Sequence, residues 1–154
     1  MRKAKLRDLP EILKIEREVF PDPWSIYSFI YELKNPANYF TVLELDGMII
    51  GYLIAGEYEK SYHLKNIAVR KNFQSMGYGK ILLEDLIKKA KRELKSYIFL
   101  EVRVTNERAI KFYEKFGFKK VRLIRGYYSF KEDAYEYLLK LNKDEENQGR
   151  KNCY

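Results

Sequence analysis

The chain has 154 residues, the length of one ordinary domain with a substantial core. Hydrophobic residues make up 46% of it and charged residues 34%, and no apolar run reaches the about 18 residues that a membrane span requires. These values exclude a membrane-spanning protein. The single cysteine, Cys153, excludes an intrachain disulfide framework and a cysteine-rich zinc site. The N-terminus lacks the apolar core and the cleavage site of a secretion signal, so we expect the protein in the cytoplasm.

The net charge is strongly positive. Lysine and arginine number 30 and aspartate and glutamate 22, a net charge of +8. The polar, aperiodic segment 142–154 is neutral overall, so we predict a disordered tail there and place the whole charge on residues 1–141. A body this basic suits a polyanionic partner such as nucleic acid, a ribosome surface or a phosphorylated cofactor, and charge alone does not choose among them.

The first third of the chain predicts a pair of helices. A short extended start over residues 3–6 leads into a helix for which Asp8 is the expected N-cap. Pro21 must end this helix, and Ser25 begins a second one. The stiff, aromatic segment 20–24 therefore joins the two helices.

The middle of the chain predicts a hairpin, a third strand and a helix. Residues 39–45 and 48–58 flank Asp46-Gly47, the dipeptide that most strongly signals a tight hairpin turn. A third strand, 62–70, ends at a glycine-bearing turn. Apolar residues at helical spacing then predict a helix, with the face Leu82, Leu83, Leu86, Ile87, Ala90 and Leu94.

The last part of the body predicts a strand over 97–104, a short helix over 107–116 closed by a glycine, and two further strands over 118–125 and 134–141. This order of elements is typical of an α+β or mixed α/β domain, and we expect residues 1–141 to form one such domain.

One motif could bind phosphate. Gln74, Gly77 and Gly79 lie between a predicted strand and a predicted helix. Glycines let the backbone approach a ligand closely, free N–H groups at a helix N-terminus bind phosphate oxygens, and Lys80 adds charge. On these residues alone a plain strand-to-helix turn is the more frequent explanation, and the spacing fits neither a Walker loop nor a dinucleotide fingerprint.

Four polar side chains could carry chemistry, each with a structural alternative. Glu101 lies on the aromatic face of its predicted strand and could instead pair with a cation on a neighbouring strand. Asn106 is a plausible helix N-cap, and Tyr113 could be a core aromatic residue. His63, the only histidine, is conceivable as a second base, but a surface histidine on a strand is the more frequent case, so we leave it out of the predicted site.

In their order along the chain these motifs resemble the GNAT superfamily of acetyl-CoA-dependent N-acetyltransferases, and the similarity covers about residues 3 to 141. The superfamily resemblance is carried by Gln74-x-x-Gly77-x-Gly79, Leu100-Glu101-Val102-Arg103, Asn106 and Tyr113-Glu114-Lys115-Phe116-Gly117-Phe118. A closer similarity to the ribosomal-protein alanine N-acetyltransferases and their archaeal relatives is carried by Pro23-Trp24-Ser25, Asn66-Ile67-Ala68-Val69 and Tyr127-Tyr128.

The resemblance implies a central, mostly antiparallel, twisted sheet of about six to seven strands flanked by helices. It also implies acetyl-CoA as co-substrate and no metal. The implied cofactor-binding residues are Ile67, Ala68, Val69, Gln74, Ser75, Met76, Gly77, Tyr78, Gly79, Lys80 and Asn106. Ser75 and Met76 depart from the family pattern, which usually has a basic and a longer polar residue there, so side-chain contacts to the cofactor are weakened while the backbone cradle remains.

For the reaction, the resemblance implies Glu101 as general base, directly or through a water, and Tyr113 as general acid for the leaving thiolate. Trp24, Tyr127 and Tyr128 are the implied acceptor-binding residues. The implied reaction is direct transfer of the acetyl group to the N-terminal α-amine of a protein, with a ribosome or ribosomal protein as a possible partner and no need for a membrane or nucleic acid. Two alternatives stay open, a lysine side chain or small amine as acceptor and, more distantly, a basic RNA- or ribosome-binding module without catalysis.

Overall fold

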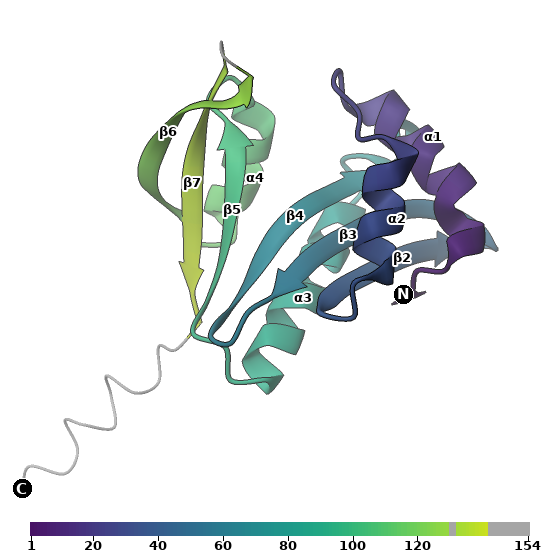
Figure 1. Cartoon of the computed structure of the whole chain (residues 1–154), viewed down its shortest axis with the longest axis horizontal. Helices are drawn as coiled ribbons and strands as arrows, with labels where there is room; N and C mark the ends of the chain where they lie inside the picture. The colour runs from purple at the N-terminus through teal and green to yellow at the C-terminus, as the bar shows by residue number, and fades with distance from the viewer. Residues whose placement is uncertain (130–131, 142–154) are drawn as a thin grey trace, which may run out of the picture. The chain divides into compact units, whose positions relative to one another are not determined.

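The computed structural model describes residues 1–129 and 132–141 and contains one seven-stranded sheet with four α-helices (Figure 1). The strand order is β1-β2-β3-β4-β5-β7-β6. β2 pairs antiparallel with β1 and β3, β7 pairs antiparallel with β5 and β6, and β4 pairs in parallel with β5. This confirms the predicted fold class. The strands are β1 (Arg2–Lys3), β2 (Asn38–Leu45), β3 (Met48–Glu57), β4 (Ser61–Val69), β5 (Tyr97–Arg103), β6 (Lys119–Ser129) and β7 (Glu132–Lys140). The helices are α1 (Leu9–Val19), α2 (Ile26–Lys34), α3 (Tyr78–Arg92) and α4 (Glu107–Lys115), with 3-10 turns at η1 (Leu6–Asp8) and η2 (Lys71–Phe73).

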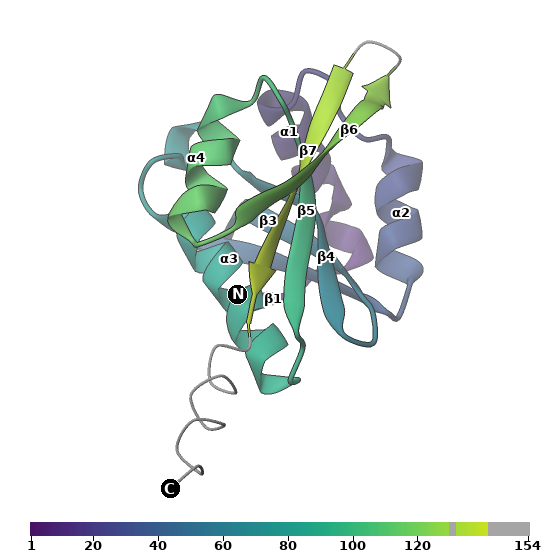
Figure 2. The ribbon, with the colours of Figure 1, turned by 90° about the vertical axis from the view of Figure 1, so that its left-hand side faces the viewer.

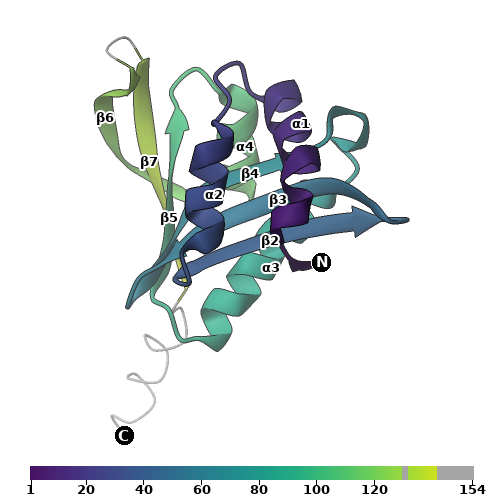
Figure 3. The same cartoon turned by 45° about the vertical axis from the view of Figure 1, so that its right-hand side comes forward.

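The chain divides into two compact units, one made of residues 1–58 and 64–89 and the other of residues 59–63 and the described residues from 90 onward. In the first unit, α1 and α2 cover one face of β2 and β3, and α3 lies on the other face (Figures 1 and 3). The core between α1, α2 and the sheet contains fully buried side chains from every layer, among them Ile12, Ile15, Phe29, Val42, Tyr52 and Ile54. Hydrophobic periodicity in the sequence therefore identifies the faces that pack together.

Local signals in the first unit act as predicted. Asp46 and Gly47 both have positive φ, +52° and +78°, as a tight turn between two strands of right-handed twist requires. The hydroxyl of Ser25 accepts a hydrogen bond of 3.3 Å from the backbone N–H of Ser28 and so caps α2. The helix before it ends at Val19, ahead of Pro21.

The second unit contains β5, β7 and β6 with α4 beside them (Figure 2). Burial alternates along β5, where Ile98, Leu100 and Val102 are buried and the residues between them are partly exposed. Gly117 has φ +93° and ends α4, and the N–H of Phe118 then donates to the carbonyl of Tyr113. This closure brings the rings of Tyr113 and Phe118 to 5.7 Å between centroids.

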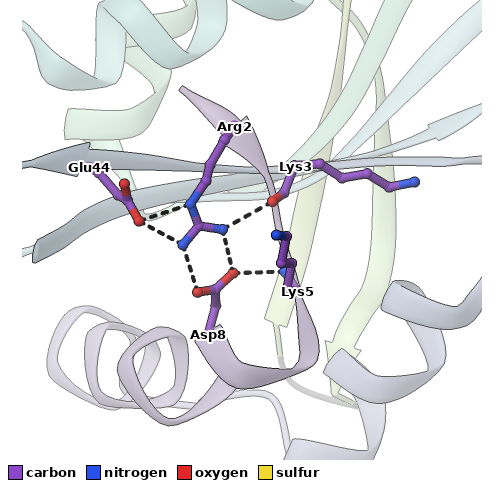
Figure 4. A network of polar contacts seen from close by, with 5 residues as sticks. All are labelled: Arg2, Lys3, Lys5, Asp8 and Glu44. Atoms are coloured by element: carbon purple, nitrogen blue, oxygen red, sulfur yellow. Dashed lines mark hydrogen bonds and ion pairs between the residues drawn. The ribbon is translucent and has the colours of Figure 1, made fainter. Parts of the chain in front are cut away.

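The N-terminal prediction needs a correction, because Asp8 precedes α1 but its side chain does not cap it. The carboxylate of Asp8 instead accepts two hydrogen bonds of 2.8 Å from Arg2 and one of 2.7 Å from the N–H of Lys5 (Figure 4). Arg2 also binds Glu44 of β2. Asp8 therefore closes the short turn η1 and ties β1 to it, which a local capping pattern does not reveal.

Two boundaries also differ from prediction. Leu94 lies beyond the end of α3, is 86% exposed and has φ +57°, while the N–H of Lys95 donates to the carbonyl of Ala90. A left-handed residue after a helix lets the last carbonyls find partners, and here that requirement overrides the helical spacing of Leu94. Strand β6 runs on to Ser129, so Tyr127 and Tyr128 belong to it. The predicted tail at 142–154 lies outside the described residues, and within those residues no helix is both long and apolar enough to cross a membrane.

Candidate active site

The second unit contains a carboxylate–imidazole pair. The Nε2 atom of His63 and the Oε2 atom of Glu101 lie 2.5 Å apart. The side chains are 18% and 11% exposed, respectively. In the parallel pair of β4 and β5, His63 is opposite Phe99, two residues before Glu101, so both rings and the carboxylate share one face. A largely buried carboxylate bonded to a group that can itself accept or donate a proton is suited to acid–base chemistry.

His63 is the residue that the sequence underestimates. Its ring stacks on Phe99 at 4.4 Å between centroids and 5° between planes, and its side chain is mostly covered. The expectation of a surface histidine is therefore wrong. The alternation of side chains along β4 predicts the face of the strand on which His63 lies. Only the parallel pairing of β4 with β5 shows that this side chain meets Glu101.

Two aromatic residues of β6 stand next to Glu101. The hydroxyl of Tyr128 donates a 3.2 Å hydrogen bond to the backbone carbonyl of Glu101, and its ring lies 4.2 Å from the guanidinium of Arg103. The ring of Tyr127 packs edge-on against the ring of Tyr128, with 4.8 Å between centroids, and Tyr127 is 46% exposed. Burial, then the neighbouring Tyr127, raises the pKa of Tyr128 to about 12, so its hydroxyl keeps its proton at neutral pH and acts as a donor. The structure thus brings the predicted acceptor-binding pair to the strand of the predicted base.

Tyr113 is buried on the inner face of α4, where it packs against Phe112 and Phe118. Burial, and to a smaller extent Tyr128, raises the pKa of Tyr113 far above its ordinary value of about 10. A phenol of this kind is a poor source of a fully transferred proton for a thiolate, since a thiol has a pKa of about 8.5. It can still donate a hydrogen bond to developing negative charge, which is how we interpret the predicted general acid.

The predicted cofactor-binding segment lies in the first unit. Ala68 and Val69 at the end of β4 are buried, and Gly51 of β3 lets that strand end lie close, because a Cβ at position 51 would come within 2.9 Å of the Ala68 carbonyl. Gly51 is a packing requirement that the sequence motifs do not include. The side-chain amide of Gln74 donates 2.9 Å to the Val69 carbonyl, so Gln74 anchors the following loop to the strand.

The loop over residues 75–77 is exposed, and its backbone alternates between positive and negative φ. Ser75 and Gly77 have φ +63° and +90°, and Met76 between them is 65% exposed. Successive N–H groups in such a loop, ahead of a helix, can point to one anion. The side chain of Lys80 is 66% exposed and lies 3.8 Å from Glu84. These residues fit a diphosphate held by backbone groups, with a cation available at the rim.

Two further predicted site residues have structural contacts. Asn106 caps α4, since its side-chain oxygen accepts from the N–H of Ala109 at 3.2 Å, as the structural alternative predicted. Trp24 lies in the segment between α1 and α2, and its ring is 5.4 Å from that of Phe29. It borders an open surface hollow of about 410 Å³ that Tyr27, Ser28, Tyr31 and Glu32 also line.

No three histidine, cysteine, aspartate or glutamate side chains gather as a metal site within the part of the chain that the structure describes.

Comparison with known proteins places this chemistry in one family. The family described as "Acetyltransferase (GNAT) family" matches residues 9–118. An N-alpha-acetyltransferase of Sulfurisphaera tokodaii is 35% identical over 148 residues, which cover 88% of this chain and 89% of that protein. A [ribosomal protein bS18]-alanine N-acetyltransferase of Escherichia coli K12 is 32% identical over 123 residues, which cover 79% of this chain and 81% of that protein.

Solved structures agree. The crystal structure of the ribosomal-protein-S18-alanine N-acetyltransferase from Escherichia coli matches with a TM-score of 0.84 and 29% identity, over 91% of this chain and 92% of that one. A chain of the NatC complex bound to Gag peptide and CoA matches with a TM-score of 0.76 and 25% identity, over 92% and 97%. The fold and the matched residues therefore define an acyltransferase. The chain belongs to the acetyltransferase (GNAT) family, as its sequence motifs predicted.

Proposed function

We propose that this protein transfers the acetyl group of acetyl-CoA to the N-terminal α-amine of an acceptor protein, with residues 1–141 acting as one catalytic domain. The observation that carries the proposal is the Glu101–His63 pair beside Tyr128. The relatives named as N-alpha-acetyltransferases support the choice of acceptor. A ribosomal protein as acceptor, and the cytoplasm as the location, belong to the same proposal.

Removal of a proton from the acceptor is the first requirement, because an α-amine has a pKa of about 8 and is largely protonated at neutral pH. Glu101 takes this proton, directly or through a water, and His63 shares it across their 2.5 Å contact. Tyr127 and Tyr128, whose rings pack edge-on beside Glu101, are the proposed aromatic contacts of the entering peptide in the second unit, and Trp24 of the first unit is a further proposed acceptor-binding residue. Aromatic side chains of this kind suit a peptide that enters the site with its N-terminus first.

Acetyl-CoA supplies an acetyl group already activated as a thioester. Backbone groups of Ile67, Ala68 and Val69 hold its pantetheine arm as an added strand, and a strand N–H near Val69 donates to the acetyl oxygen. The N–H groups from Ser75 to Lys80 hold its diphosphate, and Asn106 contacts it from the start of α4. In the transfer a C–N bond would form and the C–S bond would break: the attacking nitrogen would release its second proton to water, and CoA would leave as a thiolate that accepts a hydrogen bond from the hydroxyl of Tyr113.

A matched pair of peptides tests the proposal. One peptide has a free N-terminus, and the other has the same sequence with the N-terminus blocked. Release of CoA with the free peptide only, together with binding of acetyl-CoA in isothermal titration, is the expected result. Absence of acetyl-CoA binding at tens of micromolar, or equal turnover of both peptides, would contradict it, and the second outcome would favour a lysine or small-amine acceptor.

A further inference from the structure

A second carboxylate is buried far more deeply than Glu101 and has no role in the reaction described above. Glu16 of α1 is 1% exposed. Its Oε1 atom accepts a 3.0 Å hydrogen bond from the backbone N–H of Trp24. Its Oε2 atom accepts from the side-chain amide of Asn66 at 2.9 Å and from the hydroxyl of Tyr52. Among the described residues, all three partners of this carboxylate are neutral.

The chemistry of the three donors explains why a carboxylate is needed. A backbone N–H, an amide NH₂ and a phenol can all donate, and a carboxylate offers only acceptor sites to them. Glutamine at position 16 would place an NH₂ group against at least one of these donors. Burial of a carboxylate without a cation is costly, so the sequence retains Glu16 at a cost that a well-packed apolar residue would avoid.

The partners of Glu16 come from segments that serve different substrates. Trp24 lies in the segment between α1 and α2 that contacts the acceptor in the proposed function. Asn66 immediately precedes Ile67–Val69, the backbone that holds the pantetheine arm. Tyr52 of β3 lies between them, and its ring packs edge-on against Phe29 at 5.8 Å, while Phe29 also contacts the ring of Trp24. One carboxylate thus joins the acceptor segment to the cofactor strand.

We propose that Glu16 is a positioning residue for acetyl transfer: it fixes the acceptor segment 23–25 at a set height above the cofactor strand β4. The inference rests on the proposed function, because it takes Trp24 to contact the acceptor. The bond of Ser25 into α2 and the packing of the Trp24 ring on Phe29 tie the segment to α2. Glu16 ties the same segment to Asn66 of β4. Loss of the bond from Glu16 to Trp24 therefore lets the acceptor segment shift relative to β4, while β4 and its cofactor contacts stay in the sheet.

The test compares Glu16→Gln with Asp85→Asn. Asp85 is a matched control because it too accepts from a tyrosine hydroxyl, that of Tyr39, in the same unit but away from the acceptor segment. We expect Glu16→Gln to raise the KM of the acceptor peptide roughly tenfold with the Kd of acetyl-CoA within about twofold of wild type, since misplaced binding groups lose catalytic power steeply. Asp85→Asn should leave both constants near wild type. Both variants are assayed well below their unfolding midpoints.

An unchanged acceptor KM in Glu16→Gln, with only a lowered unfolding midpoint, would show that Glu16 stabilises the fold and nothing more. A second measurement needs no variant. The Trp24 amide of the wild-type protein should exchange with deuterium as slowly as amides inside α1, and fast exchange would overturn the proposal. This measurement does not depend on activity. If the wild-type protein acetylates no peptide, that result contradicts the proposed function, and the exchange rate still tests the bond from Glu16 to Trp24.

Discussion

Glu101 on β5 and Glu16 on α1 are both covered carboxylates with a tyrosine close by, yet their surroundings differ in kind. Glu101 is 11% exposed and is bonded to His63, a side chain that can accept or donate a proton. Glu16 is 1% exposed and is bonded only to neutral donors that keep their protons. Burial by itself therefore does not make a carboxylate catalytic in this protein. The hydrogen-bond partner decides the role of each carboxylate. A general base needs a partner that can exchange protons, whereas a positioning carboxylate needs donors that keep theirs.

The largest effect that this comparison predicts is on turnover at Glu101. Glu101→Gln keeps the shape of the side chain and removes the proton acceptor, so kcat should fall by about a hundredfold or more. The affinity for acetyl-CoA should stay nearly unchanged. Steady-state kinetics across pH 6 to 9 at saturating acetyl-CoA, with isothermal titration for affinity, measure both. Wild-type turnover together with lost stability would make Glu101 a structural residue like Glu16.

Tyr113→Phe should have the next largest effect, a fall in kcat of about tenfold, because the hydrogen bond to the departing sulfur is lost. The ring still packs on Phe112 and Phe118, so the unfolding midpoint should change little. Thermal unfolding and turnover are measured on the same preparation. A large loss of stability with normal turnover would assign Tyr113 to the core alone.

Arg103 sharpens the comparison on the acceptor side. Its guanidinium lies against the ring of Tyr128 on β6 and pairs with Glu132 of β7, so it ties β5 to both strands. Arg103→Lys keeps the charge but loses the planar stack, and we expect the acceptor KM to rise about threefold to fivefold with kcat nearly unchanged. Lys120→Arg, on another cation–ring contact of β6 with Tyr135, serves as control. Equal KM values in wild type and Arg103→Lys would remove Arg103 from this role.

The smallest effect on activity is expected at Asp8, a covered carboxylate that is paired with a cation. Hydrogen bonds from Arg2 and from the N–H of Lys5 lower the pKa of Asp8 in the folded protein, with the Arg2 bond as the larger cause. A carboxyl group whose pKa is lower when folded adds stability above its unfolded pKa and loses it as the pH falls through the folded pKa.

Arg2→Gln should therefore lower the free energy of unfolding by about 1 to 2 kcal/mol at pH 7 and leave turnover unchanged. The difference from wild type should shrink as the solution is acidified and Asp8 becomes protonated. Denaturant unfolding at several pH values measures it. A difference that stays constant down to pH 2 would show that the Asp8 carboxylate is not the partner that matters.

The sequence predicts the order of elements well because local chemistry specifies it. Asp46-Gly47 carries the hairpin, Ser25 and Asn106 cap their helices, and Gly117 ends α4. Each of these signals acts within a few residues, so it can be recognised in the sequence without knowledge of the fold.

What the sequence does not predict depends on contacts between distant segments. The carboxylate of Asp8 binds Arg2 of β1 instead of capping α1, and Gln74 anchors its loop to Val69. His63 meets Glu101 only because β4 pairs with β5 in parallel. The same holds for Glu16, which no motif singles out. The contact of His63 with Glu101 and the role of Glu16 as anchor of the acceptor segment thus emerge from tertiary structure.

The measurement that tests the central claim most directly is the position of the acetyl group on a peptide that offers a free N-terminus and an internal lysine. After incubation with acetyl-CoA and the full-length protein, tandem mass spectrometry locates the modification. We predict acetylation of the α-amine, lost in Glu101→Gln. Preferential acetylation of the lysine ε-amine, or no acetylation of any free peptide N-terminus, would contradict the account.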